Sequence, residues 1–272
     1  MNRNQIKVLA SVSMFVDHFT LLVLPLLPLL LPGLFPLVGT LDAVGRGFGR
    51  LAMPLYAFFI GEGCRYTKNR RKYFLSVFLL GVGCQLVYIL DELIETGRLT
   101  AGAGAWYMNI LLCFSAAIPG GCLLRDVSDG LREKKVLRGK TALLFLWAGT
   151  LAALGVLLPY LRRTRGWGLE FDYGVWAILL AAAPAPFQKR AAKLLSFSAV
   201  LLLYCLCAFR SFPLKTPGGF PLVWLALLSL VPLLLYNGKP GSRRLKYGFY
   251  VFYPAHLGFL YLAALLIRAA AA

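Results

Sequence analysis

Long apolar stretches, separated by short clusters of charged residues, constrain the fold of this chain more than any other feature. Of its 272 residues, 59% are hydrophobic, and the stretches are roughly 17 to 25 residues long, the length that a helix needs to cross a bilayer. This pattern predicts an all-α fold, a polytopic transmembrane helical bundle that forms a single integral membrane domain over residues 1–272. The expected spans, about nine in number, are 6–24, 48–64, 73–90, 106–124, 141–160, 173–187, 194–210, 219–236 and 248–267.

The basic residues predict the orientation of this bundle. Lys and Arg outnumber Asp and Glu by 29 to 11, and 20 of the 29 lie in the N-terminal residues and in the connections 65–72, 125–140, 189–193 and 239–246. Because cytoplasmic loops are enriched in Lys and Arg, we expect a cytoplasmic N-terminus, and nine spans would place the C-terminus outside. The topology and attraction to anionic membrane lipids account for the positive charge, so nucleic acid is not an expected partner.

Two further patterns concern packing. The segment LPLLPLLLPGLFPLVG (24–39) contains prolines that break a helix, so we expect a kinked or partly re-entrant connection at the outer face. The six cysteines fall in or beside predicted spans without a CxxC pair, so they are expected to be apolar packing residues, and no metal site is predicted.

The chain has only two histidines, and each lies about ten residues inside a predicted span. An ionisable side chain is costly at that depth, and imidazole is suited to proton transfer near neutral pH, so His18 and His256 are candidate catalytic residues. Lys7 lies eleven residues before His18, about 16 Å along a helix and on the same face. Lys246 lies ten residues before His256, so the two imidazoles are expected to meet in a common buried chamber. The alternative is that both histidines only join helices by hydrogen bonds.

Asp17 is the third candidate for a catalytic role. Adjacent side chains on a helix point about 100° apart, so Asp17 is expected to pair with a basic or hydroxyl group of another helix rather than with His18. In the last span Pro254 should kink the helix beside His256, and Tyr253, about one turn before His256, is placed to orient the imidazole.

Charged residues flank the second predicted span. Arg46 and Arg50 are four residues apart and face the same way, which suits either a clamp on a substrate carboxylate or phosphate, or contact with lipid headgroups. Glu62, near the inner end, needs a partner, and Lys7 or Arg65 is expected to form a structural ion pair with it.

The cluster RYTKNRRKY (65–73) offers a binding site for the phosphates of a nucleotide-like cofactor, although topology alone also explains its charge. The candidate cofactor-binding residues are Lys7, Arg65, Lys68, Arg70, Arg71 and Lys72. On the outer side, Asn109, Asp172 and Tyr173 are expected to bind an amine-bearing acceptor. The alternative is that the acidic residues there are only solvated charges of a loop.

Several blocks of the sequence resemble one family. The blocks KVLASVSMFVDHF, GRLAMPLYAFFIGEGCRYTKNRRKY, FDYGVWAILL and LLLYNGKPGSRRLKYGFYVFYPAHL, in this order, resemble the TraX family of bacterial inner-membrane proteins, named for the enzyme that acetylates the N-terminus of F-type conjugative pilin. TraX proteins in turn look like distant relatives of membrane acyltransferases such as acyltransferase family 3. Those have Lys or Arg, ten residues and then His in the first span, which Lys7 and His18 match. Their arginine pair at the third span is matched loosely by Lys68, Arg70 and Arg71.

The resemblance implies an acyl-CoA-dependent O- or N-acyltransferase of the inner membrane. It would move an acyl group from cytosolic acetyl-CoA, or another acyl-CoA, to an amine or hydroxyl at the outer face, such as a peptide N-terminus or an envelope glycan. His18 would be a general base or a transient acyl carrier, and His256 would position the acceptor or supply a second proton step. Arg46, Arg50, Glu62 and Tyr253 would line the acceptor site. A proton-coupled transporter or flippase, and a non-catalytic pilus or envelope assembly factor, are the alternatives.

Overall fold

The computed structural model shows a helical protein that contacts divide into two compact units. The first unit comprises Met1–Leu55 and Leu201–Ala272, and the second comprises Tyr56–Val200. The boundary falls within helices α3 and α9, and the single domain expected from the sequence stays a prediction. The structure describes residues 1–97, 107–135, 137–165, 170–209, 214–216, 218–242 and 245–271.

Helix α1 (Arg3–Leu22) opens the first unit and begins at a capping box. The Asn2 side chain accepts from the backbone N–H of Gln5, and the Gln5 side chain accepts from that of Asn2. The proline-rich segment then forms two 3-10 helices, η1 (Leu24–Leu29) and η2 (Pro32–Leu37), before α2 (Val38–Gly49). The prolines therefore interrupt the α-helix, which confirms the kinked connection predicted for this segment.

Helices α1 and α2 pack closely because α2 presents glycines to α1. A side chain at Gly45 would clash with Thr20, and one at Gly49 would clash with Asp17. The first unit also contains the end of α9 (Arg190–Ala208), η3 (Leu222–Ser229), α10 (Leu230–Leu234) and α11 (Leu245–Ala271).

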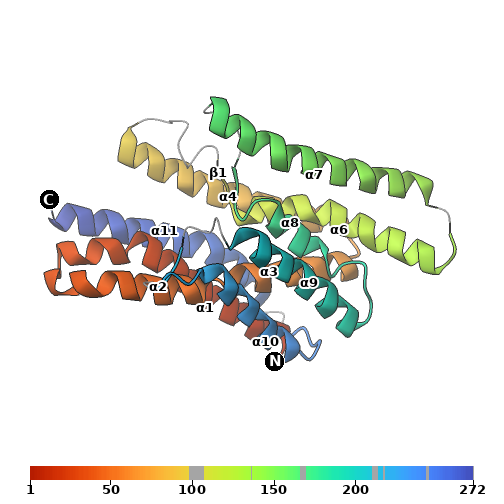
Figure 1. Ribbon diagram of the computed structural model, residues 1–272, viewed down its shortest axis with the longest axis horizontal. Coiled ribbons are helices and arrows are strands. Elements are labelled where there is room, and N and C mark those ends of the chain that lie inside the picture. Colours follow the sequence, from red (N-terminus) through yellow and green to blue (C-terminus); the bar gives the residue numbers. More distant parts are fainter. Residues whose placement is uncertain are drawn as a thin grey trace. The chain divides into compact units, whose positions relative to one another are not determined.

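Helix α11 runs beside α1 in the same direction. Lys7 lies over the ring of Phe249, and further along both helices His18 contacts His256. Figure 1 shows α1, α2 and α11 side by side. His18 and His256, which the sequence predicted at the same depth of two different spans, therefore lie at the same level in the first unit.

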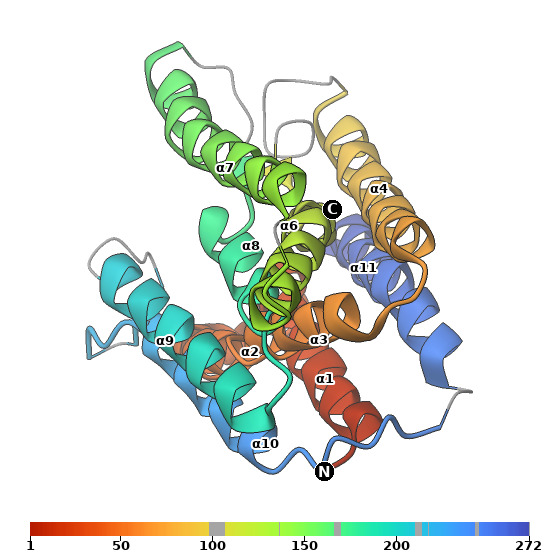
Figure 2. The ribbon, with the colours of Figure 1, turned by 90° about the vertical axis from the view of Figure 1, so that its right-hand side faces the viewer.

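Helix α6 (Ile110–Arg132) is the centre of the second unit and packs against α4 (Arg70–Thr96), α7 (Arg138–Arg165) and α8 (Val175–Ala182), as Figure 2 shows. Its glycines permit these contacts. Gly120 packs against Trp147, and Gly121 packs against Cys64 of α3 (Ala52–Tyr66). The short strands β1 (Tyr107–Met108) and β2 (Glu170–Phe171) pair in parallel before α6 and α8.

Five described helices are long and apolar enough to cross a membrane, and they coincide with the third, fourth, fifth, seventh and ninth predicted spans. They are Arg70–Ile94, Ile110–Arg132, Arg138–Leu161, Arg190–Ala208 and Gly248–Ala271. These helices support a helical membrane protein. The membrane window of α7 is not buried within the protein, which suits a helix that faces lipid.

The other four predicted spans take different forms. Helix α1 has 20 residues, but its polar side chains lower its hydropathy. The second span, predicted as one helix over 48–64, is divided between the end of α2 and α3, because the chain turns at Arg50 and Leu51. Helix α8 has only 8 residues, and the eighth span is η3 followed by α10. The total of nine stays a prediction.

Connections that were predicted to be cytoplasmic lie at a common end of the second unit. Arg65 binds Asp129 and Arg70 binds Asp126, both in the last turns of α6, and Lys140 at the start of α7 also binds Asp126. The connections 65–72 and 125–140 are thus neighbours.

The first unit shows the same arrangement for its own connections. The amino group of Met1 donates to the carbonyl oxygen of Leu235 over 2.6 Å. The backbone N–H of Arg3 donates to the carbonyl oxygen of Lys239 over 2.9 Å. The basic N-terminal segment therefore lies against the start of the basic connection 239–246.

Candidate active site

The two histidines of the chain are in direct contact in the first unit. Nδ1 of His18 on α1 lies 3.0 Å from Nε2 of His256 on α11, and the ring centroids are 5.1 Å apart. His256 is buried and His18 is half-buried. The structure thus brings together the two imidazoles that the sequence predicted to converge, while their catalytic roles stay predictions.

Three groups on α11 hold the imidazole of His256. Its Nδ1 lies 2.9 Å from the backbone carbonyl oxygen of Phe252, and the Phe252 ring stacks on it at 4.8 Å with an interplanar angle of 6°. Tyr253 packs edge-on at 5.7 Å. Sequence reasoning predicted the neighbour Tyr253 and missed Phe252. The four-residue spacing of Phe252 and His256, which places both side chains on one helix face, could have indicated the ring contact.

Asp17 is bound by both arginines of the predicted pair, Arg46 on α2 and Arg50 directly after this helix. Nη1 of Arg46 donates to Oδ2 of Asp17 over 2.8 Å, and Nη2 of Arg50 donates to Oδ1 over 2.6 Å. Arg50 is further fixed by a hydrogen bond from its Nε to the carbonyl oxygen of Arg46. The prediction that Asp17 pairs with a basic group of another helix is confirmed. The arginine clamp holds a carboxylate of this chain, so its role toward a substrate stays a prediction.

Two further polar side chains of α1 that lie near α2 have hydrogen-bond partners. The Ser13 hydroxyl donates to the carbonyl oxygen of Phe48 over 2.7 Å, and the Thr20 hydroxyl donates to that of Asp17 over 2.8 Å. Ser13, Asp17 and Thr20 follow the three- and four-residue spacing of one helix face. One face of α1 is therefore a structural polar interface with α2, whereas His18 belongs to the face toward α11.

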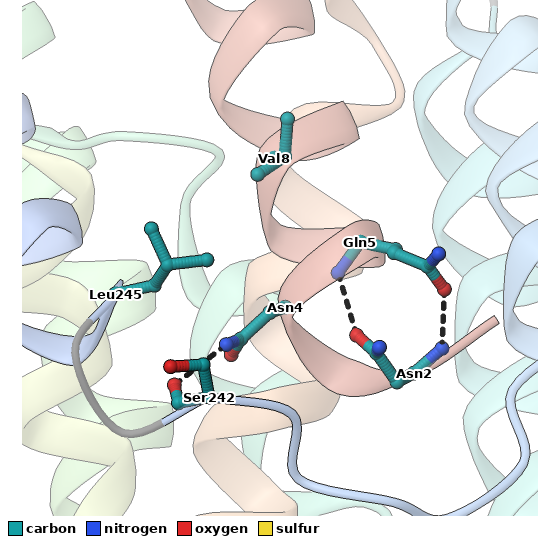
Figure 3. A pocket seen from close by; sticks show the side chains of 6 residues that line it. All are labelled: Asn2, Asn4, Gln5, Val8, Ser242 and Leu245. Atoms are coloured by element: carbon teal, nitrogen blue, oxygen red, sulfur yellow. Dashed lines mark hydrogen bonds between the residues drawn. The ribbon is translucent and has the colours of Figure 1, made fainter.

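A cavity of about 350 Å³ lies at the N-terminal end of α1, which is large enough for part of a cofactor. Figure 3 shows its lining, in which Asn4 donates to the carbonyl oxygen of Ser242 over 2.7 Å. Val8, the residue that follows Lys7 in the chain, also lines the cavity. The lining residues are Asn2, Asn4, Gln5, Val8, Ser242 and Leu245.

The basic cluster 65–73 is in the second unit and is partly neutralised by the protein itself. Arg65 binds Asp129 at 2.9 Å, and Arg70 binds both oxygens of Asp126 at 2.8 and 2.7 Å. Three exposed cations of the cluster make no ion pair with the described part of the chain and are the ones open to a phosphate: Lys68, Arg71 and Lys72.

Glu62 forms a buried ion pair, but with a different partner from the one expected. Its Oε1 lies 3.2 Å from Nζ of Lys193 on α9, and the same Nζ donates to the Tyr66 hydroxyl over 2.9 Å. Lys193 was not among the partners, Lys7 or Arg65, that the sequence suggested. Lys193 is 131 residues away in the sequence, so no helical spacing could have indicated it. A substrate role for Glu62 stays a prediction.

Asn109 has a structural part as the N-cap of α6. Its Oδ1 accepts from the backbone N–H groups of Leu111 and Leu112, and its Nδ2 donates to the carbonyl oxygen of Gly81 and to Gln85. All its polar atoms thus have partners inside the protein, and its acceptor-binding role stays a prediction.

Asp172 and Tyr173 follow β2 at the end of the second unit that carries the strand pair. Oδ1 of Asp172 accepts from the Tyr107 hydroxyl over 2.6 Å, which ties β1 to the residue after β2. Tyr173 has a φ of 58°, a conformation that is uncommon for a residue other than glycine. Their contact with an acceptor also stays a prediction.

Comparison with known proteins adds a family to this geometry. The model of the family described as TraX protein matches residues 2–264. The chain is also similar to a protein of Dichelobacter nodosus named probable fimbrial assembly protein FimC, serogroup H1, with 26% identity over 278 residues, which cover 97% of this chain and 96% of the relative. No solved structure matches the chain. Because the family model matches nearly the whole sequence, this helical membrane protein belongs to the TraX family.

Proposed function

We propose that this protein is a membrane-embedded acyltransferase that moves an acyl group from cytosolic acyl-CoA to an amine or hydroxyl acceptor at the outer face. One observation carries the proposal: the imidazoles of His18 on α1 and His256 on α11 lie 3.0 Å apart. Burying such groups is costly, and paired imidazoles can take up and release protons during acyl transfer. His18 is half-buried and His256 is buried, so His18 is the member of the pair to which we assign contact with the substrate.

The cavity at the N-terminal end of α1 supports a route for the donor. It is lined by Val8, and ten residues of helix separate Val8 from His18, a rise of about 15 Å. An extended pantetheine arm spans a comparable length. The nucleotide end of acyl-CoA would stay in the cavity near Lys7 while the thioester reaches the imidazole of His18.

The chemical step follows from these positions. His18 removes the proton from the acceptor nitrogen or oxygen, which forms a bond to the thioester carbonyl carbon. The carbon–sulfur bond then breaks, and the CoA thiolate leaves with the proton that His18 had taken up. In the alternative, an imidazole nitrogen of His18 attacks the thioester carbonyl carbon, the carbon–sulfur bond breaks, and the CoA thiolate leaves from a transient acyl-His18 intermediate. The acceptor then attacks the acyl carbon, the bond to His18 breaks, and the acceptor proton goes to the thiolate.

The proposed topology is a multi-pass protein of the bacterial inner membrane with about nine spans and a cytoplasmic N-terminus. Its support is the gathering of basic connections at one end of each unit. Helices α1 and α11 run in the same direction, as a first and a ninth span would, because odd-numbered spans all cross the membrane in the same direction. Under this topology, the cavity opens toward the cytoplasm, where acyl-CoA is found.

The experiment is acyl transfer by the purified protein in detergent or nanodiscs with acetyl-CoA labelled in the acetyl group. The parent protein should release or transfer label, and His18→Ala should lose this activity. Cys207→Ser changes an exposed cysteine of α9 and serves as the matched control with full activity. A parent protein that neither hydrolyses acetyl-CoA nor transfers its label to any tested amine would contradict the proposal.

A non-catalytic role in fimbrial assembly is the second candidate function. The name of the Dichelobacter nodosus relative, a probable fimbrial assembly protein, favours it. An assembly factor would bind its partner through its helices and would need neither imidazole. In a host that lacks its own TraX-family gene, the double variant His18→Ala, His256→Ala would then restore assembly as well as the parent, whereas an acyltransferase would lose this ability.

A further inference from the structure

The contacts of His256 fix where the protons of the histidine pair lie. Nδ1 of His256 is 2.9 Å from the carbonyl oxygen of Phe252. A carbonyl oxygen only accepts hydrogen bonds, so Nδ1 of His256 must carry the proton. In a neutral imidazole the other nitrogen then has the lone pair, and Nε2 of His256 is an acceptor.

This assignment determines the tautomer of His18. Nε2 of His256 is 3.0 Å from Nδ1 of His18, so Nδ1 of His18 must be the donor. The lone pair of His18 is therefore on Nε2, which has no hydrogen-bond partner among the described residues. The Phe252 ring, stacked at 4.8 Å on the imidazole of His256, holds the acceptor nitrogen in this direction.

The surrounding charges favour neutral rings in the resting protein. Asp17 precedes His18 in the chain, but its two oxygens are bound by Arg46 and Arg50, so one negative charge faces two positive charges. If one imidazole of the pair became protonated, it would also repel a proton on the other ring, 3.0 Å away. The neutral pair, in which Nε2 of His18 is the basic nitrogen without a hydrogen-bond partner among the described residues, is the state that this environment supports.

We propose that His256 is a positioning residue, which uses the carbonyl group of Phe252 to fix the tautomer of His18 and leaves Nε2 of His18 as the basic nitrogen of the site. The tautomer rests on geometry alone, and only its use in acyl transfer rests on the proposed function. When Nε2 of His18 takes the acceptor proton, the hydrogen bond from Nδ1 of His18 to His256 becomes charge-assisted and stronger. Nε2 of His18 then passes that proton to the CoA thiolate, and His256 neither gains nor loses a proton.

Nitrogen NMR on protein labelled with ¹⁵N-histidine tests the tautomer directly, because the chain contains only two histidines. Spectra of His18→Gln and His256→Gln assign the two rings. In the parent, the His18 ring should show a protonated Nδ1 and an unprotonated Nε2. In His256→Ala, the His18 ring should shift toward the Nε2–H form that free imidazole side chains prefer. A parent His18 with a protonated Nε2 would overturn the proposal.

The kinetic test separates positioning from acceptor binding. His256→Gln keeps an oxygen that can accept from Nδ1 of His18, whereas His256→Ala does not. If His256 positions His18, the alanine variant should lose about 100-fold in kcat with little change in the KM of the acceptor, and the glutamine variant should recover part of the loss. A raised acceptor KM with unchanged kcat would overturn the proposal. An inactive parent with the expected NMR tautomer would contradict the acyltransferase function alone.

Discussion

Asp17 and His18 are neighbours on α1, yet they contact different helices. Asp17 binds Arg46 and Arg50 at the end of α2, whereas His18 contacts His256 of α11. The angle of about 100° between adjacent side chains on a helix explains this division. The carboxylate fixes the position of α1 against α2, and the imidazole contacts α11.

Loss of the Asp17 charge should destabilise the first unit. Asp17→Asn removes the negative charge that two largely buried guanidinium groups share, and breaking such a pair costs about 3–5 kcal/mol. Thermal unfolding in detergent measures the change. Glu133→Gln removes an exposed ion pair with Lys135 and should leave the unfolding temperature unchanged. An Asp17→Asn protein as stable as the parent would show that the arginines do not depend on this carboxylate.

Filling the cavity at the end of α1 should weaken donor binding. Val8→Trp puts a bulky ring into a lining position, so the KM for acetyl-CoA should rise about tenfold, while kcat stays near that of the parent. Val12→Trp is the matched control, because Val12 is an exposed residue one turn further along α1 that does not line the cavity. Equal effects of the two substitutions on KM would exclude the cavity as the donor site.

The ion pair of Glu62 and Lys193 should behave as one buried unit. Glu62→Leu or Lys193→Met alone leaves a single buried charge and should lower the free energy of unfolding by about 3–5 kcal/mol. The double variant removes both charges and should recover most of this loss. A double-mutant cycle of unfolding free energies measures the coupling. Additive losses in the double variant would argue against a coupled pair.

Cysteine labelling should reveal the orientation of the second unit. Of the six cysteines only Cys207 is exposed, so Cys207→Ser provides a background with low reactivity. In this background Glu170→Cys should react with a membrane-impermeant maleimide added to intact spheroplasts, and Lys135→Cys should react only after permeabilisation. Both positions are exposed in the structure. The reverse pattern would place the N-terminus outside.

Hydropathy predicted the helices that are long and uniformly apolar, because length and composition alone decide whether a segment can cross a bilayer. It did not predict where a segment of the same composition is interrupted. Gly45 and Gly49 let α2 lie close to α1, and α2 ends at Gly49, whereas the sequence predicted a helix that begins at residue 48. Likewise, an apolar run at 222–234 gave no sign of its 3-10 portion.

The candidate site was predictable in part for a similar reason. A buried charge needs a partner, and helical spacing shows which face it is on, so the meeting of His18 with His256 and the pairing of Asp17 followed from the sequence. Spacing within one helix does not reveal contacts between distant helices, so the Lys193 partner of Glu62 was missed. The carbonyl group of Phe252 was missed because side-chain patterns carry no record of backbone acceptors.

The separation of 238 residues between His18 and His256 has a consequence for biosynthesis. Arg46 and Arg50 follow Asp17 within 33 residues, so the ribosome delivers the partners of the carboxylate almost at once. The partner of His18 emerges later by about ten to fifty seconds, at ordinary rates of translation. A nascent or truncated chain that lacks α11 therefore has no complete histidine pair, and the contact between the two imidazoles forms only after α11 has been synthesised.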